Sequence, residues 1–223
     1  SANLRTLEIV NEGPGEIYFD CREDIPVYRN VDPTKTSVDK TFNNINSLEI
    51  LIDSADVVVS RSEDENTYVK AIGTPIFIDS LAVRQTKGVL TVKYEKRDKR
   101  ERNLTRGNKV DIALGSDMGK RIRAAINGSG SIDVQLPFKT GSVLINGSGE
   151  VTLTDIDDFE ARINGSGDIQ CNRVLNQKVK INGSGDYSIN ESMRAFKGTI
   201  NGSGDINLKN GELDTFDLSI RGS

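Results

Sequence analysis

Ile181-Asn-Gly-Ser-Gly185 is one of five copies of a short phrase that decides the fold of this chain. The chain also stops inside a related stretch, Ile220-Arg-Gly-Ser223. The other copies are Ile126–Gly130, Ile145–Gly149, Ile163–Gly167 and Ile200–Gly204. Successive starts are 19, 18, 18, 19 and 20 residues apart, and such a regular period is typical of a solenoid in which each repeat forms one coil.

Each repeat predicts a strand, a tight corner and a second strand. Val179 and Ile181 alternate with lysines before the corner, and Asp186-Tyr-Ser-Ile189 alternates after it, which is the period of a strand. The Asn-Gly-Ser-Gly between them consists of turn-forming residues. Aligned copies give apolar columns that coils stacked about 4.8 Å apart would bury together. We therefore expect an all-β, single-stranded β-helix or β-solenoid with coils of 18–20 residues.

The chain divides into two parts on this pattern. Residues 1–40 are not repetitive, and we expect their short strands to cap the solenoid, because an open coil exposes unpaired backbone groups. Residues 41–223 are expected to form the solenoid, with degenerate coils over 41–125 and regular repeats over 126–223. The degenerate part predicts a turn at Lys87-Gly88. Its predicted strands are Leu48–Ile52, Val57–Val59, Tyr68–Ile72, Ile76–Ile78, Leu81–Val83, Val89–Val92 and Val110–Leu114.

Composition excludes several function classes. The net charge of −4 and pI near 5.1 do not favour nucleic acid as a partner. No apolar run approaches the roughly 18–20 residues that span a bilayer, and no signal peptide is present in this sequence. The absence of histidine excludes Ser-His-Asp and Cys-His catalysis and His-ligated metals, and no cofactor is predicted.

The two cysteines, Cys21 and Cys171, do not have the spacing of a metal site. Cys171 falls in an apolar column, where a free cysteine behaves as a small hydrophobic residue. That interpretation is favoured, and a disulfide to Cys21 is the alternative.

The residue after the corner is acidic in four consecutive repeats, at Glu150, Asp168, Asp186 and Asp205. In a stack these carboxylates form a ladder whose repulsion is screened by solvent and nearby basic residues, or by calcium. The exposed polar ladder is favoured over the calcium site, and a pair of acids serving a glycosidase is a weaker alternative. The preceding asparagines, Asn127 to Asn201, are expected to hydrogen-bond along the stack.

Residues 93–109 contain eight basic and three acidic side chains. A charge-mixed run of this kind favours a solvated loop, and the alternative is a patch for an anionic partner. The residues of that candidate patch are Lys96, Arg97, Lys99, Arg100, Arg102 and Arg106.

Residues 42–223 resemble the head GIN domain family, whose members are described as autotransporter adhesins. The resemblance rests on Phe42–Ile45 leading to Leu48–Ile52, on Asp56–Val59, on Gly88–Val92 and on the serial Ile-Asn-Gly-Ser-Gly phrases. It implies a right-handed β-helix-like solenoid, a cell-envelope or surface location, and no catalytic residues.

The leading functional hypothesis is a non-enzymatic surface, secreted or periplasmic module for adhesion or scaffolding, whose partner is a protein or polysaccharide at the cell surface. One alternative is self-assembly into a homo-oligomer through an uncapped C-terminal coil at Leu218, Ile220 and Arg221. Another is a β-helix that binds or cleaves polysaccharide, which rests on fold analogy. Neither nucleic-acid binding nor membrane insertion is expected.

Overall fold

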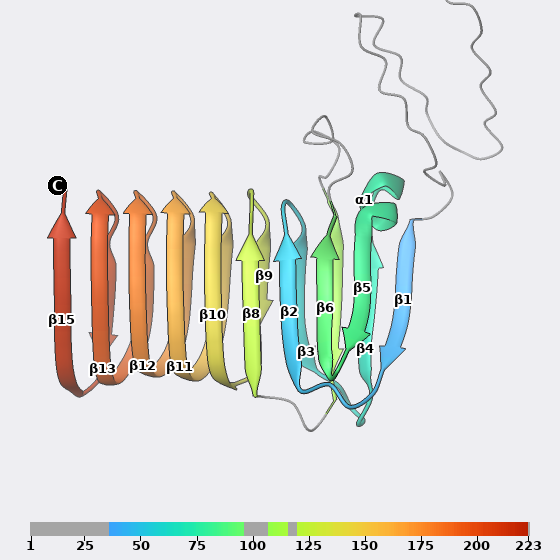
Figure 1. The fold of residues 1–223 in the computed structure, drawn as a ribbon, viewed down its shortest axis with the longest axis horizontal. Helices are drawn as coiled ribbons and strands as arrows, with labels where there is room; N and C mark the ends of the chain where they lie inside the picture. The colour runs from blue at the N-terminus through green and yellow to red at the C-terminus, as the bar shows by residue number, and fades with distance from the viewer. Residues whose placement is uncertain (1–35, 96–106, 116–119, 223) are drawn as a thin grey trace, which may run out of the picture.

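The protein is a β-solenoid of about five turns, seen here in a computed structural model that describes residues 36–95, 107–115 and 120–222 (Figure 1). The predicted all-β solenoid is confirmed. The early elements are β1 (Ser37–Phe42), β2 (Ser47–Ile52), β3 (Asp56–Arg61), β4 (Thr67–Ile72), α1 (Pro75–Ser80), β5 (Leu81–Thr86), β6 (Val89–Tyr94) and β7 (Lys109–Leu114). The later ones are β8 (Arg121–Ile126), β9 (Ser131–Val134), β10 (Phe138–Gly147), β11 (Glu150–Gly165), β12 (Asp168–Gly183), β13 (Tyr187–Gly202), β14 (Ile206–Asn210) and β15 (Leu213–Arg221).

Each regular coil has two sides. The residues just after a corner form the back side, and the chain then bends and returns along the front side to the next corner. β11 and β12 each cover a whole coil of this kind in 16 residues, and they pair in parallel from Glu150↔Asp168 to Gly165↔Gly183. The 19-residue spacing from Asn182 to Asn201 is absorbed in the bend of β13, where Arg194 adopts φ 62° beside a register shift.

The apolar columns predicted from the repeats form one continuous core. The isoleucines that precede the five full corners are 0–4% exposed. Their alternation with polar neighbours places every second side chain inside, as the strand period requires. Tyr187, the largest residue of the column after the corner, is fully buried and stacks near Phe159 with ring centroids 6.3 Å apart.

The Asn-Gly-Ser-Gly corners stack directly on one another. The amide nitrogen of Asn146 donates to Oδ1 of Asn127 at 2.8 Å, and the same bond repeats up the stack as far as Asn201. The predicted asparagine ladder is therefore confirmed. It ends at Arg221, which occupies the asparagine position of β15.

The order of the coils in space differs from their order along the chain. The β2–β3 coil lies between the β6–β7 coil and the β8–β9 coil, since β2 pairs with both β6 and β8, and β3 with both β7 and β9 (Figure 1). The β2–β3 corner has three residues, one fewer than the regular corners. In the β6–β7 coil the corner is replaced by residues 95–108, because β6 ends at Tyr94 and β7 begins at Lys109.

An antiparallel cap closes the N-terminal end. β4 pairs antiparallel with β7, β1 with β4, and β5 with β6, so β4 and β5 cover the first coil and are not coils themselves. The predicted strand at Ile76–Ile78 is wrong, because these residues lie in α1. Thr74 caps the helix and Pro75 occupies its first turn, and both are signals of a helix start. The apolar residues Ile76–Ile78 that follow them suggested a strand instead. The turn at Lys87-Gly88 is confirmed, with φ of 49° and 77°.

Candidate functional site

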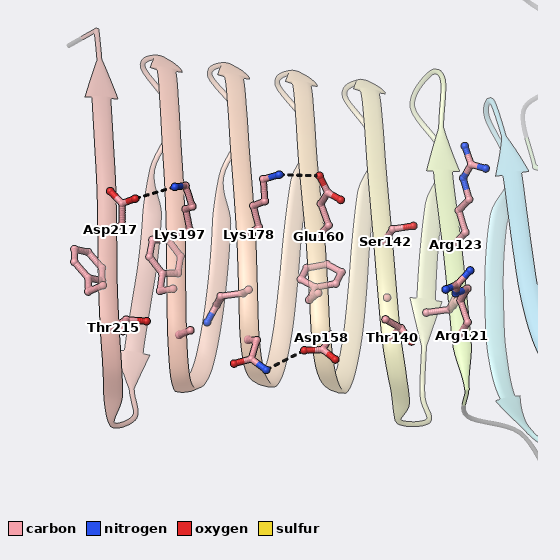
Figure 2. Close-up of a pocket in the computed structure, with 18 residues that line it drawn as sticks. Arg121, Arg123, Thr140, Ser142, Asp158, Glu160, Lys178, Lys197, Thr215 and Asp217 are labelled. Carbon is pink, nitrogen blue, oxygen red and sulfur yellow. Dashed lines mark hydrogen bonds and ion pairs between the residues drawn. The ribbon is translucent and has the colours of Figure 1, made fainter.

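The front sheet carries a groove that crosses six neighbouring strands. We define the front sheet as residues 121–126, 140–146, 158–164, 176–182, 195–201 and 215–221, which pair in register from β8 to β15. The groove has a volume of about 660 Å³ and is lined by residues from all six strands (Figure 2). Because it crosses the strands, it runs along the solenoid axis and meets one coil every 4.8 Å or so.

Two outward-facing columns form the walls of this front groove. The register places the members of each column opposite one another on adjacent coils. The first wall is Arg121, Thr140, Asp158, Asn176, Ala195 and Thr215. The second wall is Arg123, Ser142, Glu160, Lys178, Lys197 and Asp217. The first wall consists mainly of short side chains, and every residue of the second wall except Ser142 is charged (Figure 2).

The floor of the groove lies over an inward column between the walls. Phe159 and Phe196 in this column are only 4% and 2% exposed, so the groove sits on the surface of the core. Gly141 leaves no side chain at its level, and the space beneath is filled by Ile156 and Phe159. The floor is therefore the strand backbone over this column, and the polar groups that can orient a ligand stand on the two walls.

The acids of the groove are paired with basic residues or amides. Glu160 lies 3.7 Å from Lys178, and Asp217 lies 3.1 Å from Lys197. Asp158 accepts a 2.9 Å hydrogen bond from the amide of Asn176. These pairs are exposed and contribute little stability, about 0–1 kcal/mol each. The groove lining itself holds four basic and three acidic side chains, a net charge of +1.

Charge is divided unequally between the two sides of the solenoid. The front sheet holds seven basic and three acidic side chains, a net charge of +4. The matching back-side segments, residues 131–134, 150–154, 168–172, 186–190 and 205–209, hold one basic and five acidic side chains, a net charge of −4. Since the whole chain is at −4, the front sheet is a local basic surface on an acidic protein.

The acidic ladder on the back side bonds to the backbone. Oδ1 of Asp168 accepts the backbone N–H of Asp186 at 2.9 Å, and Asp186 accepts that of Asp205 in the same way. Glu150, the first acid of the column, accepts from Gln170 at 3.4 Å. Among the described residues no group of three or more His, Cys, Asp or Glu side chains could hold a metal ion. These hydrogen bonds give the aspartates of the ladder a structural role, because each one joins two adjacent coils.

The other predicted sites lie at two edges of the molecule. The basic patch Lys96, Arg97, Lys99, Arg100, Arg102 and Arg106 lies outside the described residues, between β6 and β7 in the sequence. Leu218, Ile220 and Arg221 lie in β15, the outermost strand at the C-terminal end (Figure 1).

Sequence reasoning missed the front groove. Its residues are spread over six repeats, and singly each reads as a solvated strand residue. The repeats also align the outward residues of these strands. Those outward columns contain more basic than acidic side chains, beside the small residues Thr140, Ser142 and Ala195.

A buried polar network lies behind the groove. The Tyr187 hydroxyl donates to Oε1 of Gln177 at 2.7 Å, and Nε2 of Gln177 donates to the Ser192 hydroxyl. Cys171 is a free, buried thiol, as the core interpretation predicted, and Cys21 lies outside the described residues. The otherwise apolar column therefore accepts a glutamine because its amide is satisfied on both sides.

Removing one member of this network should destabilise the fold. We expect Tyr187→Phe to lower the free energy of unfolding by about 1–3 kcal/mol, because it leaves the Gln177 carbonyl buried without its donor. The triple change Tyr187→Phe, Gln177→Leu, Ser192→Ala should recover most of that loss, since no buried polar group is then orphaned. Urea unfolding followed by circular dichroism measures both. A triple variant less stable than the single one would contradict this account.

These features define a capped, parallel β-solenoid with one basic, grooved side. The family described as "Putative auto-transporter adhesin, head GIN domain" matches residues 41–211, and the chain belongs to this family. The predicted resemblance is thereby confirmed. No curated protein matches the chain.

Several solved structures are similar in fold. A "putative lipid binding protein" from Parabacteroides distasonis has 16% identity over 86% of this chain and 96% of its own, with a TM-score of 0.46. A "putative adhesin" from Bacteroides fragilis has 17% identity over 86% and 99%, with a TM-score of 0.43. A "putative cell adhesion protein" from Clostridium sporogenes has 12% identity over 84% and 99%, with a TM-score of 0.43.

Membership in this family fits a non-enzymatic cell-surface or envelope module. No helix in the described part of the chain has the length and apolar character needed to cross a membrane.

Proposed function

We propose that this protein is a non-enzymatic adhesion module that binds a linear acidic polysaccharide along the front groove. The observation that carries the proposal is the groove itself, set in a sheet of net charge +4 on a chain of net charge −4. A polymer that repeats its acidic group along an extended chain suits a surface that repeats its basic groups coil by coil.

The groove residues match the chemistry of such a polymer. Arg121 and Arg123 carry planar guanidinium groups that bind carboxylates in a bidentate manner, and Lys178 and Lys197 carry mobile ammonium groups. Arg123 is paired with Glu49 at 3.2 Å, and the two lysines are paired with Glu160 and Asp217, so a polymer carboxylate would compete with these exposed ion pairs. Short polar groups such as Thr140 and Asn176 can exchange hydrogen bonds with sugar hydroxyls. Binding then needs no reaction, as expected for adhesion.

The test is a titration of the whole chain with oligogalacturonate, measured by isothermal calorimetry. We expect binding that weakens as salt is raised, because the charged contacts are exposed to screening. Lys178→Glu and Lys197→Glu should each lower the affinity by about tenfold. Lys209→Glu on the back side is the matched control, because it makes the same charge change away from the groove.

Two outcomes would overturn the proposal. One is the absence of heat and of any salt-dependent binding with oligogalacturonate while the protein remains folded. The other is an equal loss of affinity in Lys209→Glu, which would show a general charge effect. Equal binding of poly-glutamate would replace the polysaccharide with an acidic polypeptide as the partner.

A further inference from the structure

The C-terminal end of the solenoid exposes side chains that belong to the core columns. Phe216 and Ile220 of β15 stand in register with Phe196 and Ile200 of β13. The β13 residues are 2% and 4% exposed, whereas Phe216, Leu218 and Ile220 are 57%, 36% and 59% exposed. Within the described residues β15 pairs only with β13, so its outer backbone edge has no strand partner. An apolar edge strand of nine residues is a template for pairing.

The opposite end is closed against such pairing. The ammonium group of Lys40 in β1 donates to the backbone carbonyl of Val83 in β5 at 3.0 Å, and Gln85 donates to the carbonyl of Asn43 at 2.7 Å. α1 lies at the same end beside β5, and its Phe77 is buried (Figure 1). Charged residues that occupy edge carbonyls are a known protection of sheet edges. Among the described residues, the outer strands at this end, β1 and β5, are antiparallel cap strands that these side-chain bonds tie to each other, and they do not form a parallel coil on which β15 of another copy could stack.

From these two ends we infer that two copies of this chain join through β15, C-terminal end to C-terminal end, as a closed dimer. A two-fold axis perpendicular to the front sheet makes the two β15 strands antiparallel. It also keeps Phe216, Leu218 and Ile220 of both copies on the core side, since residues of one parity remain on one face. Because this pairing uses the β15 edge of each copy and is symmetric, the assembly closes at two chains.

Charge selects the register of the two strands. Placing Asp217 opposite Arg221 of the second copy forms two symmetric ion pairs, sets Leu218 against Ile220, and leaves Ser219 facing its own copy on the axis. Lys197, 3.1 Å from Asp217, extends each pair. A shift that placed Asp217 opposite itself would set like charges together, which destabilises a strand pair.

The test is the mass in solution of the whole chain, measured by light scattering and sedimentation from about 1 to about 100 µM. We expect a concentration-dependent species of twice the 24.4 kDa chain mass, and no larger one. Ile220→Lys should give a single chain throughout this range. Ile72→Lys is the matched control, because Ile72 is an equally exposed apolar residue, 65% exposed, in the N-terminal cap. Circular dichroism establishes that each variant is folded.

A charge exchange tests the register independently of folding, since both residues are exposed. Arg221→Glu should weaken the dimer by about tenfold, and Asp217→Lys combined with Arg221→Glu should restore most of that loss. The inference is overturned if the chain stays single at every concentration, if larger polymers form, if Ile220→Lys remains a dimer, or if the double change fails to recover association.

Discussion

Gly183→Ala should destabilise the solenoid by about 3–5 kcal/mol, the largest effect we expect from any single substitution in the repeats. Gly183 has φ 134°, a conformation that L side chains rarely adopt, and an added Cβ would lie 2.2 Å from the carbonyl oxygen of Gly165 on the preceding coil. The obstacle is backbone, so no side-chain movement relieves it. The coil would have to separate from its neighbour or change its corner.

Chemical unfolding followed by circular dichroism measures this effect. Ser184→Ala is the matched control, because Ser184 is exposed and its backbone N–H keeps the 2.9 Å bond to Gly165. We expect the control to change stability by less than about 0.5 kcal/mol. A Gly183→Ala variant as stable as the control would show that the corners do not need close backbone contact.

The same contact explains why the corner phrase repeats. A Cβ on Gly165 would lie 2.3 Å from the carbonyl oxygen of Gly147, and one on Gly202 would lie 2.1 Å from that of Gly183. The backbone of each corner thus excludes a side chain at the equivalent position of the next corner, so glycine is required there in every coil of the stack. The Asn-Gly-Ser-Gly repeat therefore reports coil packing, and it is no evidence for a ligand at the corner.

Features set by one coil and its neighbour were predictable from the sequence. The period gave the register, the register gave the inward columns, and the asparagine ladder followed because identical residues on adjacent coils are within hydrogen-bond reach. The strands Leu48–Ile52 and Val57–Val59 on either side of the β2–β3 corner were predictable in the same way, from the alternation of their apolar residues.

Features that depend on non-local pairing were not predictable in this way. The insertion of the β2–β3 coil between later coils leaves no trace in local periodicity, because parallel and antiparallel partners need the same alternation of apolar residues. For the same reason β4 and β5 looked like coils. At α1 the apolar run Ile76–Ile78 was too short to distinguish helix from strand, and the Thr74-Pro75 start was the better signal.

The candidate site lies between these two cases. The register that positions the walls of the groove was available from the repeats. The basic character of the front sheet appears only when the outward residues of all six strands are counted together. Taken singly, Arg162 and Lys180 look like ordinary exposed residues on the outer face of a strand. A charge difference between two sides of a solenoid is a property of columns, and it becomes visible once columns are compared.

Raising the pH above 9 should destabilise the protein through two buried groups in its core. Burial raises the pKa of the Cys171 thiol from 9.0 to about 12, and burial also raises the pKa of the Tyr187 hydroxyl well above 10.0. Below pH 9 both groups keep their protons in the folded and unfolded states, so they add no pH dependence. Above about pH 9 the unfolded chain releases the thiol proton, and above about pH 10 it releases the tyrosine proton, while the folded chain retains both. Stability then falls by up to about 1.4 kcal/mol per pH unit for each group.

Cys171→Val separates this effect from the titration of surface lysines, because valine is close in size and has no proton to lose. Urea unfolding of both proteins at pH 7, 8, 9, 10 and 10.5 gives the difference in their free energies of unfolding. That difference should stay constant up to about pH 9 and then shift in favour of the variant by roughly 1 kcal/mol per pH unit. A difference independent of pH would mean that the thiol ionises as easily in the folded protein as in the unfolded chain, and that Cys171 is not held in the closed core between β11 and β13.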